Sequence, residues 1–258
     1  MKIKSLVTAT IGIAALLITP SVRAAEIKVL ASNGVREAMN ELAPAFERAT
    51  GNKLVISFGL AAVLKRQIEG GAAFDLAILP AAAIDDLAKQ GKVDAGARAP
   101  IARSGVGIGI KKGAPRPDIR TPQALKRTLL AADSITWAKE GQSGIYFAGL
   151  LERIGIAEQM KPKIVPASTG VEVGKLVALG QVQLGVILVN ELMAAPGVEV
   201  LGPLPPELQN YTVFHAGVGV GSKDSSAAKA LIKFLTTPSA GAVFKAKGQE
   251  AGETGGLN

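Results

Sequence analysis

Apolar segments typical of β-strands alternate with amphipathic segments typical of helices, and this alternation limits the fold more than any other feature of the chain. Residues 26–31 (EIKVLA) are an apolar run, and apolar residues recur every three or four positions through 35–50, up to Gly51. The same order repeats twice within residues 53–91. Successive β-α-β units with apolar strands indicate a mostly parallel sheet covered by helices on both faces. The sequence therefore predicts an α/β protein.

Two glycine-spaced strands interrupt this pattern. The segment GVGIGI begins at Gly105, and FHAGVGVGS spans residues 214–222; a second α/β set lies between them, over 134–189. We interpret the two glycine-rich strands as crossovers that join two lobes of about 100 residues, an ordinary domain size. The predicted division is residues 25–103 plus 215–258 for lobe I and 104–214 for lobe II. A single larger sheet is the alternative.

Composition excludes several classes of site. The 258 residues include no cysteine and one histidine, so disulfides, thiol catalysis and cysteine-based zinc sites are ruled out. We also find no dinucleotide fingerprint, phosphate-binding loop or cluster of metal ligands in the sequence. The prediction is that the protein uses no cofactor and no metal.

The N-terminal segment MKIKSLVTATIGIAALLITPSVRA has the features of a secretory signal peptide. Lys2 and Lys4 precede an apolar run that ends before Pro20, and small residues before the Ala24–Ala25 bond predict cleavage after Ala24. The alternative is an uncleaved anchor, but the run is shorter than the roughly 20 residues that span a bilayer. We expect a periplasmic protein.

The charge of the chain does not indicate a nucleic-acid partner. The formal net charge is +8, and removal of Lys2, Lys4 and Arg23 with the signal peptide leaves +5 (8 − 3). Basic residues are spread along the chain, and aromatic residues make up 4% of it. Nucleic-acid binders gather basic and aromatic residues into a patch. We expect a solvated surface that mildly attracts anions, and a monomer.

Loops that follow strands and precede helices are the expected place for a ligand. Ligands of open α/β sheets bind beyond the carboxyl ends of the strands, where helix starts present free N–H groups that suit anions. Four such loops occupy equivalent places, two in each predicted lobe: residues 32–34, 59–63, 140–146 and 167–173. Each loop alone is also explained by ordinary helix capping. Their convergence predicts one anion site between the lobes.

A family resemblance supports this prediction. The segments SNG, AMNELAPAFERATG, GQSGIY, KLVALGQVQLGVI and AAKALIKFLTTPSA, in this order, resemble the periplasmic molybdate-binding proteins of ABC importers over nearly the whole mature chain. The resemblance implies a two-lobed periplasmic binding protein fold (type II) with two crossover strands as the hinge. It also implies an ABC permease in the inner membrane as partner, and a small anion held by hydroxyls and backbone N–H groups.

Carried over by position, the resemblance places oxyanion contacts at Gly34, the Leu60-Ala61-Ala62 turn, Ser143, Gly170 and Leu188. Family members usually have serine or threonine at these positions of the first two loops and often tyrosine at the position of Leu188. This chain has Gly34, no hydroxyl between Leu60 and Val63, and an aliphatic residue at 188. A buried anion that lacks hydrogen bonds costs several kcal/mol. These departures favour an organic carboxylate over molybdate.

A second resemblance points the same way. The segments IARSGVGIGI, GAPRPDI and GPLPPELQNYTVF resemble a divergent branch of the family that includes periplasmic aconitate isomerase, which acts on a tricarboxylate. An arginine guanidinium can donate two parallel hydrogen bonds to a carboxylate. We expect Arg103, at the cleft wall, to bind the ligand in this way. Arg36 and Lys65 lie in the first turns after their loops and are weaker candidates.

The predicted ligand-binding residues combine these arguments. They are Ser32, Asn33, Gly34, Leu60, Ala61, Arg103, Ser104, Ser143, Gly144, Gly170, Val171, Asn190 and Glu191. No base for catalysis is singled out. Glu140, Glu172 and Glu191 could serve if burial raised the pKa, whereas His215 on the second crossover strand is expected to be structural.

Two functions therefore remain open at the level of sequence. The first is a receptor that delivers a small anion to an importer, and the second is an isomerase that shifts a double bond in a tricarboxylate on the same scaffold. We favour the receptor. A sensor domain that serves a signalling partner is a third possibility.

Overall fold

The computed structural model describes residues 24–252, so the predicted signal peptide lies outside the described residues apart from Ala24. The strands are β1 (Glu26–Ser32), β2 (Lys53–Gly59), β3 (Leu76–Pro80), β4 (Val93–Lys111), β5 (Ile135–Ala138), β6 (Ile164–Ala167), β7 (Leu184–Leu188), β8 (Val198–Pro203), β9 (Tyr211–Gly219) and β10 (Glu250–Ala251). The helices are α1 (Arg36–Thr50), α2 (Ala61–Glu69), α3 (Ala81–Lys89), α4 (Pro122–Ala131), α5 (Gln142–Arg153), α6 (Ala157–Met160), α7 (Gly170–Ala178), α8 (Val189–Ala194), α9 (Ser225–Leu235) and α10 (Pro238–Ala246).

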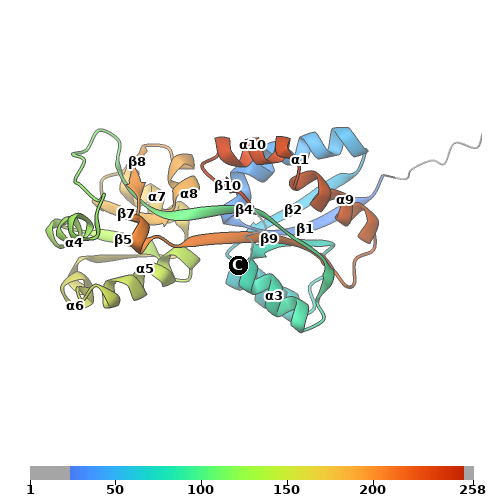
Figure 1. The fold of residues 1–258 in the computed structure, drawn as a ribbon, viewed down its shortest axis with the longest axis horizontal. Helices are drawn as coiled ribbons and strands as arrows, with labels where there is room; N and C mark the ends of the chain where they lie inside the picture. The colour runs from blue at the N-terminus through green and yellow to red at the C-terminus, as the bar shows by residue number, and fades with distance from the viewer. Residues whose placement is uncertain (1–23, 253–258) are drawn as a thin grey trace, which may run out of the picture.

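Two lobes are joined by the long strands β4 and β9, which run side by side between them (Figure 1). In the first lobe, β2, β1 and β3 are parallel, and β9, β4 and β10 continue the same sheet with antiparallel pairing. In the second lobe, β7, β5 and β6 are parallel, and β4 is antiparallel to both β7 and β8. The predicted α/β fold with two lobes and two crossover strands is confirmed.

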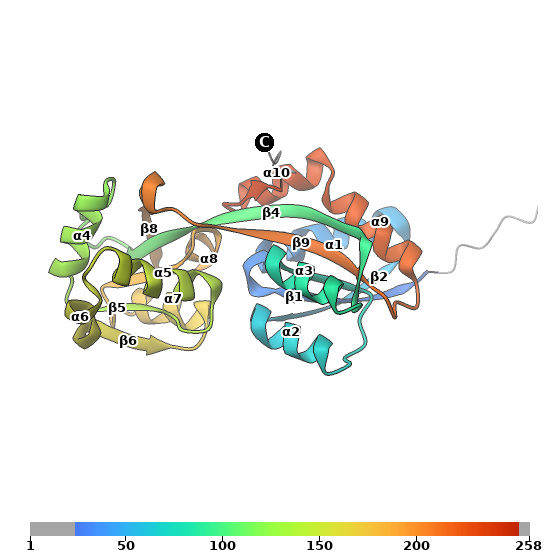
Figure 2. The same ribbon diagram turned by 60° about the horizontal axis from the view of Figure 1, so that its bottom comes forward.

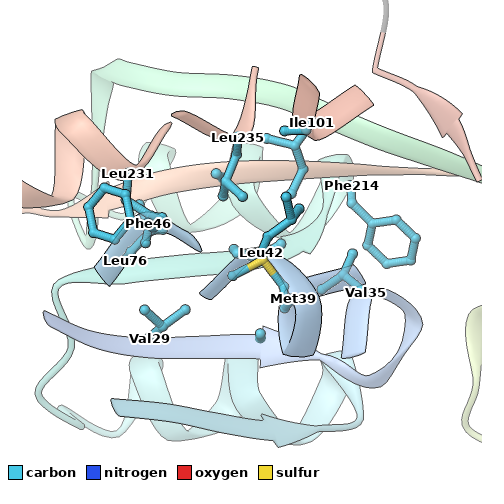
Figure 3. Close-up of a cluster of buried hydrophobic side chains, with 14 of the residues drawn as sticks. Val29, Val35, Met39, Leu42, Phe46, Leu76, Ile101, Phe214, Leu231 and Leu235 are labelled. Carbon is cyan, nitrogen blue, oxygen red and sulfur yellow. The ribbon is translucent and has the colours of Figure 1, made fainter. Parts of the chain in front are cut away.

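Each sheet is covered by helices on both faces, as its apolar strands require. In the first lobe, α1, α9 and α10 pack on one face over a core that includes Met39, Phe46 and Leu231 (Figure 3), and α2 and α3 cover the other. In the second lobe, α4, α5 and α6 cover one face and α7 and α8 the other. Figure 2 shows β4 and β9 running from the lobe that holds α4–α8 to the lobe that holds α1–α3, α9 and α10.

Glycines on β4 allow the sheet of the second lobe to contact α8 closely. A Cβ atom added at Gly109 would lie 2.5 Å from the Leu192 side chain, and one at Gly107 would lie 2.8 Å from Val189. Real Cβ atoms do not approach other heavy atoms so closely, so a larger residue would push α8 away. The glycine spacing that predicted a crossover strand thus also positions the helix that follows β7.

The structure differs from the sequence expectation in several elements. β4 begins at Val93, well before the predicted strand; β9 covers Tyr211–Gly219 instead of 214–222; and β8 and α8 were not predicted. Within residues 24–252, every helix is too short or too polar to cross a membrane.

Candidate functional site

The carboxyl ends of the parallel strands in both lobes meet at one place. In the first lobe, β1, β2 and β3 end at Ser32, Gly59 and Pro80; in the second, β5 and β7 end at Ala138 and Leu188. All five residues line one cavity of about 40 Å³, which we call the inner pocket. Its other lining residues are Asn33, Gly34, Leu60, Ala61, Glu140, Gly141, Gln142, Ser143, Gly170, Ile187, Glu191, Thr212 and Phe214. The pocket therefore lies between the lobes, against β9.

The helices that begin at the inner pocket are mostly those without a capping side chain. α2, α3 and α5 begin after Leu60, Pro80 and Gly141, which line the pocket and provide no side-chain hydrogen bond to the helix start. By contrast, Thr or Asp side chains cap α4, α9 and α10, whose caps do not line the pocket. The first N–H groups of a helix have no partner within it. At the inner pocket these donors are left for a ligand.

Three hydroxyl side chains add to the backbone donors. Ser32 and Ser143 come from different lobes, and Thr212 comes from β9. The Ser32 oxygen accepts a hydrogen bond of 3.3 Å from the backbone N–H of Gly34. Within the described residues, the Ser143 and Thr212 hydroxyls have no hydrogen-bond partner. Their O–H groups are available to an acceptor in the pocket.

Glu140 and Glu191 are the ionisable side chains in the wall of the inner pocket. Burial raises the pKa of Glu191 to about 7, and this effect outweighs the backbone hydrogen bond from Leu188, which lowers the pKa. Because burial favours the neutral acid, Glu191 is present as both acid and carboxylate near neutral pH. No lysine or arginine lines this pocket in the described part of the chain.

A second cavity, of about 340 Å³, lies beside the inner pocket and shares Asn33, Gly170 and Glu191 with it. We call it the outer groove; it is formed by α1 of the first lobe and by α7 and α8 of the second. Its remaining lining residues are Arg36, Glu37, Val171, Gly174, Lys175, Ala178, Leu179, Asn190, Ala194, Ala195 and Pro196. Arg36 and Lys175 therefore place positive charge in the groove, whereas the described wall of the inner pocket has none.

Arg36 is held in place at the edge of this groove. Its Nη2 donates a 2.7 Å hydrogen bond to Asn33 Oδ1, and its guanidinium lies 4.4 Å from the centre of the Phe58 ring. Backbone N–H groups at helix starts and O–H groups of side chains surround the inner pocket, and the Arg36 guanidinium lies outside it. This arrangement favours a ligand that accepts hydrogen bonds and carries negative charge.

Comparison with known proteins identifies the family. The family model described as "Bacterial extracellular solute-binding protein" matches residues 27–250, nearly all of the described chain. This chain belongs to that family. Among curated relatives, the molybdate-binding protein ModA of Azotobacter vinelandii is 30% identical over 258 residues, covering 95% of this chain and 97% of the relative. Aconitate isomerase of a Pseudomonas species is 29% identical over 252 residues, covering 93% and 95%.

A solved structure agrees on the fold. The periplasmic molybdate-binding protein of Azotobacter vinelandii superposes with a TM-score of 0.74 and 20% identity, covering 88% of this chain and 100% of that one. At 20% identity this similarity establishes the fold but does not identify the ligand, which has to be inferred from the residues of the site.

Eight of the thirteen residues predicted from the sequence line the inner pocket of this solute-binding protein. These are Ser32, Asn33, Gly34, Leu60, Ala61, Ser143, Gly170 and Glu191. The four strand-to-helix loops that were predicted to converge do so, and Leu188, carried over from the family resemblance, is also in the wall. Their roles toward a ligand remain a proposal.

Arg103 does not lie at the cleft wall, and this part of the prediction is corrected. Its Nε donates a 2.7 Å hydrogen bond to Glu250 Oε2, and its guanidinium lies 4.8 Å from the centre of the Tyr211 ring. The neighbouring Ser104 is buried opposite Thr212 in the β4–β9 pairing and does not line the pocket. Side chains alternate along a strand, so Arg103 and Ser104 point to opposite faces.

Three further predicted residues also lie outside the inner pocket. Gly144 packs against the end of β5, where an added Cβ would be 2.0 Å from the Ala138 carbonyl oxygen. Val171 lines the outer groove and is 74% exposed. Asn190 is buried, and its Nδ2 donates a 2.8 Å hydrogen bond to the Gly34 carbonyl of the other lobe.

His215, predicted to be structural, lies on β9 away from both cavities. Burial lowers its pKa, which favours the neutral ring. Sequence reasoning missed Pro80, Thr212 and Phe214. The sequence prediction started the second crossover strand at Phe214, so the polar Thr212 was not placed on it. Pro80 could have been predicted, because it ends the third predicted strand and ligands are expected beyond the ends of the strands.

Proposed function

We propose that this protein captures a small anion in the inner pocket and delivers it to an ABC importer of the inner membrane. The observation that carries the proposal is the convergence of uncapped helix starts from two lobes on one enclosed pocket with no lysine or arginine in its described wall. Family membership supports a role in solute capture. The predicted signal peptide and the periplasmic relative support a periplasmic location, with the protein acting as a monomer.

Within this class we favour an organic carboxylate over a bare oxyanion. Gly34, Leu60, Ala61 and Leu188 contribute no hydroxyl to the pocket, so hydrogen bonds to all four oxygens of a tetrahedral anion are harder to complete. One carboxylate needs fewer donors. The adjoining outer groove, with Arg36 at its edge, has room for the rest of an organic acid.

Calorimetric titration of the mature protein tests this proposal. The ligands are molybdate, tungstate and sulfate in one set and cis-aconitate, trans-aconitate and citrate in the other. We expect one organic acid to bind with 1:1 stoichiometry. Ser143→Ala removes an O–H donor in the pocket and should weaken binding by about 1 kcal/mol. Ser225→Ala, at an exposed position at the start of α9, is the matched control and should bind as the wild type does. Absence of binding by every ligand contradicts the proposal.

An isomerase is the second candidate, and the two carboxyl groups in the wall of one pocket favour it. A double-bond shift needs a base that takes an allylic proton and an acid that returns one. Glu140 and Glu191 line the same pocket, and the raised pKa of Glu191, about 7, suits either role. The relative named aconitate isomerase supports this candidate. Incubation with cis-aconitate distinguishes the two functions, because a receptor returns its ligand unchanged and an isomerase produces trans-aconitate.

A further inference from the structure

Glu191 stands in the partition between the inner pocket and the outer groove. It lines both cavities, and the other residues common to them are Asn33 and Gly170. The carboxyl group packs directly on the first residue of α7: a Cβ added at Gly170 would lie 3.2 Å from Glu191 Oε1 and 3.4 Å from Oε2. Any other residue at position 170 would displace the carboxyl group. Glu191 is therefore part of the wall between the two cavities, where it is half-buried.

This half-buried carboxyl group has few groups around it that would stabilise a negative charge. Its hydrogen-bonding partner is the backbone N–H of Leu188, and no ion pair to it occurs within residues 24–252. The start of α7 favours negative charge, but loss of water outweighs it, and the pKa rises to about 7.

The other charged groups around Glu191 do not neutralise it. Several charged side chains line the two cavities or a small neighbouring cavity at α8, or lie on α7, β8 and the part of β4 in the second lobe: Arg36, Glu37, Lys111, Glu140, Glu172, Lys175, Glu199 and Lys247. Arg36 is bonded to Asn33, Glu199 is paired with Arg116, and Lys247 is paired with Glu41. Glu172 accepts a hydrogen bond from the Ser168 N–H at the start of α7.

We infer that Glu191 is a neutral carboxylic acid when the pocket is occupied, and that its O–H donates a hydrogen bond to the bound anion. Whenever Glu191 is ionised in the empty pocket, binding of the anion must therefore take up one proton. This inference rests on the proposed function. It adds that the protonation state of Glu191 determines whether the pocket binds the anion. A neutral acid has one O–H donor, whereas a carboxylate only accepts. An anion beside an ionised Glu191 would meet a like charge in a buried site, with no cation in the described wall to offset it.

The pH dependence follows from this proton. Below about pH 7 the acid is already neutral, so anion affinity should be constant. Above it, each binding event must first protonate Glu191, and the affinity should fall about tenfold for each further pH unit. The anion itself raises the pKa of Glu191 in the complex, because a second negative charge disfavours ionisation.

Titrations of the wild type and of Glu191→Gln test the inference, with molybdate and trans-aconitate as probes. Both probes keep one charge state between about pH 7 and 9. Glutamine has the same shape, donates a hydrogen bond and never ionises, so Glu191→Gln should bind with an affinity that does not change over this range. Glu172→Gln is the control: it removes an exposed carboxylate from the first turn of α7 and should keep the wild-type slope. Carbon-13 NMR of the glutamate carboxyl groups, with Glu191 assigned through its variant, reports its titration without any ligand.

The outcomes separate this inference from the proposed function. A wild-type slope that Glu191→Gln abolishes, with Glu191 titrating near pH 7, supports the inference. A flat wild-type profile, an unchanged slope in Glu191→Gln, or titration of Glu191 in the ordinary range for glutamate overturns it and leaves anion capture intact. If neither probe nor any other ligand of the calorimetric set binds at any pH while Glu191 still titrates near 7, the proposed function fails, and proton-coupled capture fails with it.

Discussion

Gly34 is the residue at which the inner pocket, the core of the first lobe and the contact between lobes meet. Its N–H donates to Ser32, and its carbonyl accepts from both Asn190 Nδ2 and Gln249 Nε2, at 2.8 and 3.2 Å. Its Cα faces the Phe214 ring and the Leu188 side chain. The contacts with Phe214 and Leu188 bring the backbone closer than a side chain at position 34 would permit.

Gly34→Ala should therefore damage both stability and binding. The new Cβ would lie 2.4 Å from Phe214 Cζ and 3.3 Å from Leu188 Cδ1, so the ring must move, and overpacking of this kind costs roughly 1–3 kcal/mol. Because Phe214 also lines the inner pocket, ligand affinity should fall as well. Denaturant unfolding and calorimetry measure the two effects. Gly221→Ala is the control, since no atom lies within 4 Å of its added Cβ; loss of stability in this variant equal to that of Gly34→Ala would contradict the packing argument.

Single residues also show where sequence reasoning ends. The types of Ser32, Ser143 and Glu191 and their places after strands sufficed to bring them to one pocket. Arg103 was misplaced because its partner Glu250 is 147 residues away in the chain, and no local pattern shows that pairing. The contact of Gly34 with Phe214 was hidden for the same reason.

Most helices that begin at the inner pocket lack a capping side chain, although Thr169 caps α7, whose first residue Gly170 also lines the pocket. α4, α9 and α10 each begin with a threonine or aspartate that accepts a hydrogen bond from the first turn. α2, α3 and α5 lack such a side chain and begin at the pocket. A missing cap costs about 1 kcal/mol per helix. The proposed ligand supplies the acceptor that these helix starts lack.

Substitutions of Leu60 separate helix stability from anion binding. Leu60 is the residue before α2, in an extended conformation that suits a capping side chain. Leu60→Asp and Leu60→Asn both place an acceptor there, and the aspartate charge should make that variant more stable than the asparagine variant by about 0.3–1 kcal/mol. For anion affinity the order should reverse, because the aspartate repels the ligand. Thermal unfolding and calorimetry of the two variants give the rankings; the same order in both would contradict an anion site at α2.

At the level of elements, periodicity predicted the regular units and failed at the irregular ones. β1, β2, β3 and α1 follow clear patterns, and all were predicted. The start of β4 was not, because Pro100 and the glycine at 96 are unusual in strands; the pairing with β9 shifts register between Pro100 and Ala102 to accommodate the proline. α8 has six residues, too few to show a helical repeat.

At the level of the whole molecule, the two lobes are in direct contact beside the pocket. β4 leaves the sheet of the first lobe at Gly105 and joins that of the second at Val106. Leu188, at the end of β7 in the second lobe, packs within the core of the first. The division of the chain at 103/104 and 214/215 stays a prediction; β4 changes its pairing partners near the first of these boundaries. We call the direct contact between the lobes the closed arrangement of the pocket.

The Gly34 carbonyl provides a direct test of whether this closure matters for binding. Asn190 donates to it from α8 of the second lobe, whereas Gln249 donates from the segment before β10, which pairs with β4 in the sheet of the first lobe. Both side chains are buried, at 3% and 2% exposure. The two bonds share one acceptor atom, but only the bond from Asn190 joins the lobes.

Asn190→Ala should loosen the closed state, and Gln249→Ala should not. One hydrogen bond of this kind contributes about 0.5–1.5 kcal/mol, so Asn190→Ala should weaken ligand binding by roughly three- to tenfold and increase the radius of gyration of the free protein in small-angle X-ray scattering. Gln249→Ala removes the other donor. Because this buried amide packs within the first lobe, the substitution should lower the free energy of unfolding by a similar amount. It should leave the radius of gyration unchanged. If both variants expand the protein equally, or neither alters affinity, the Asn190–Gly34 bond does not control closure, and the rigidity of the crossover strands β4 and β9 must set the distance between the lobes.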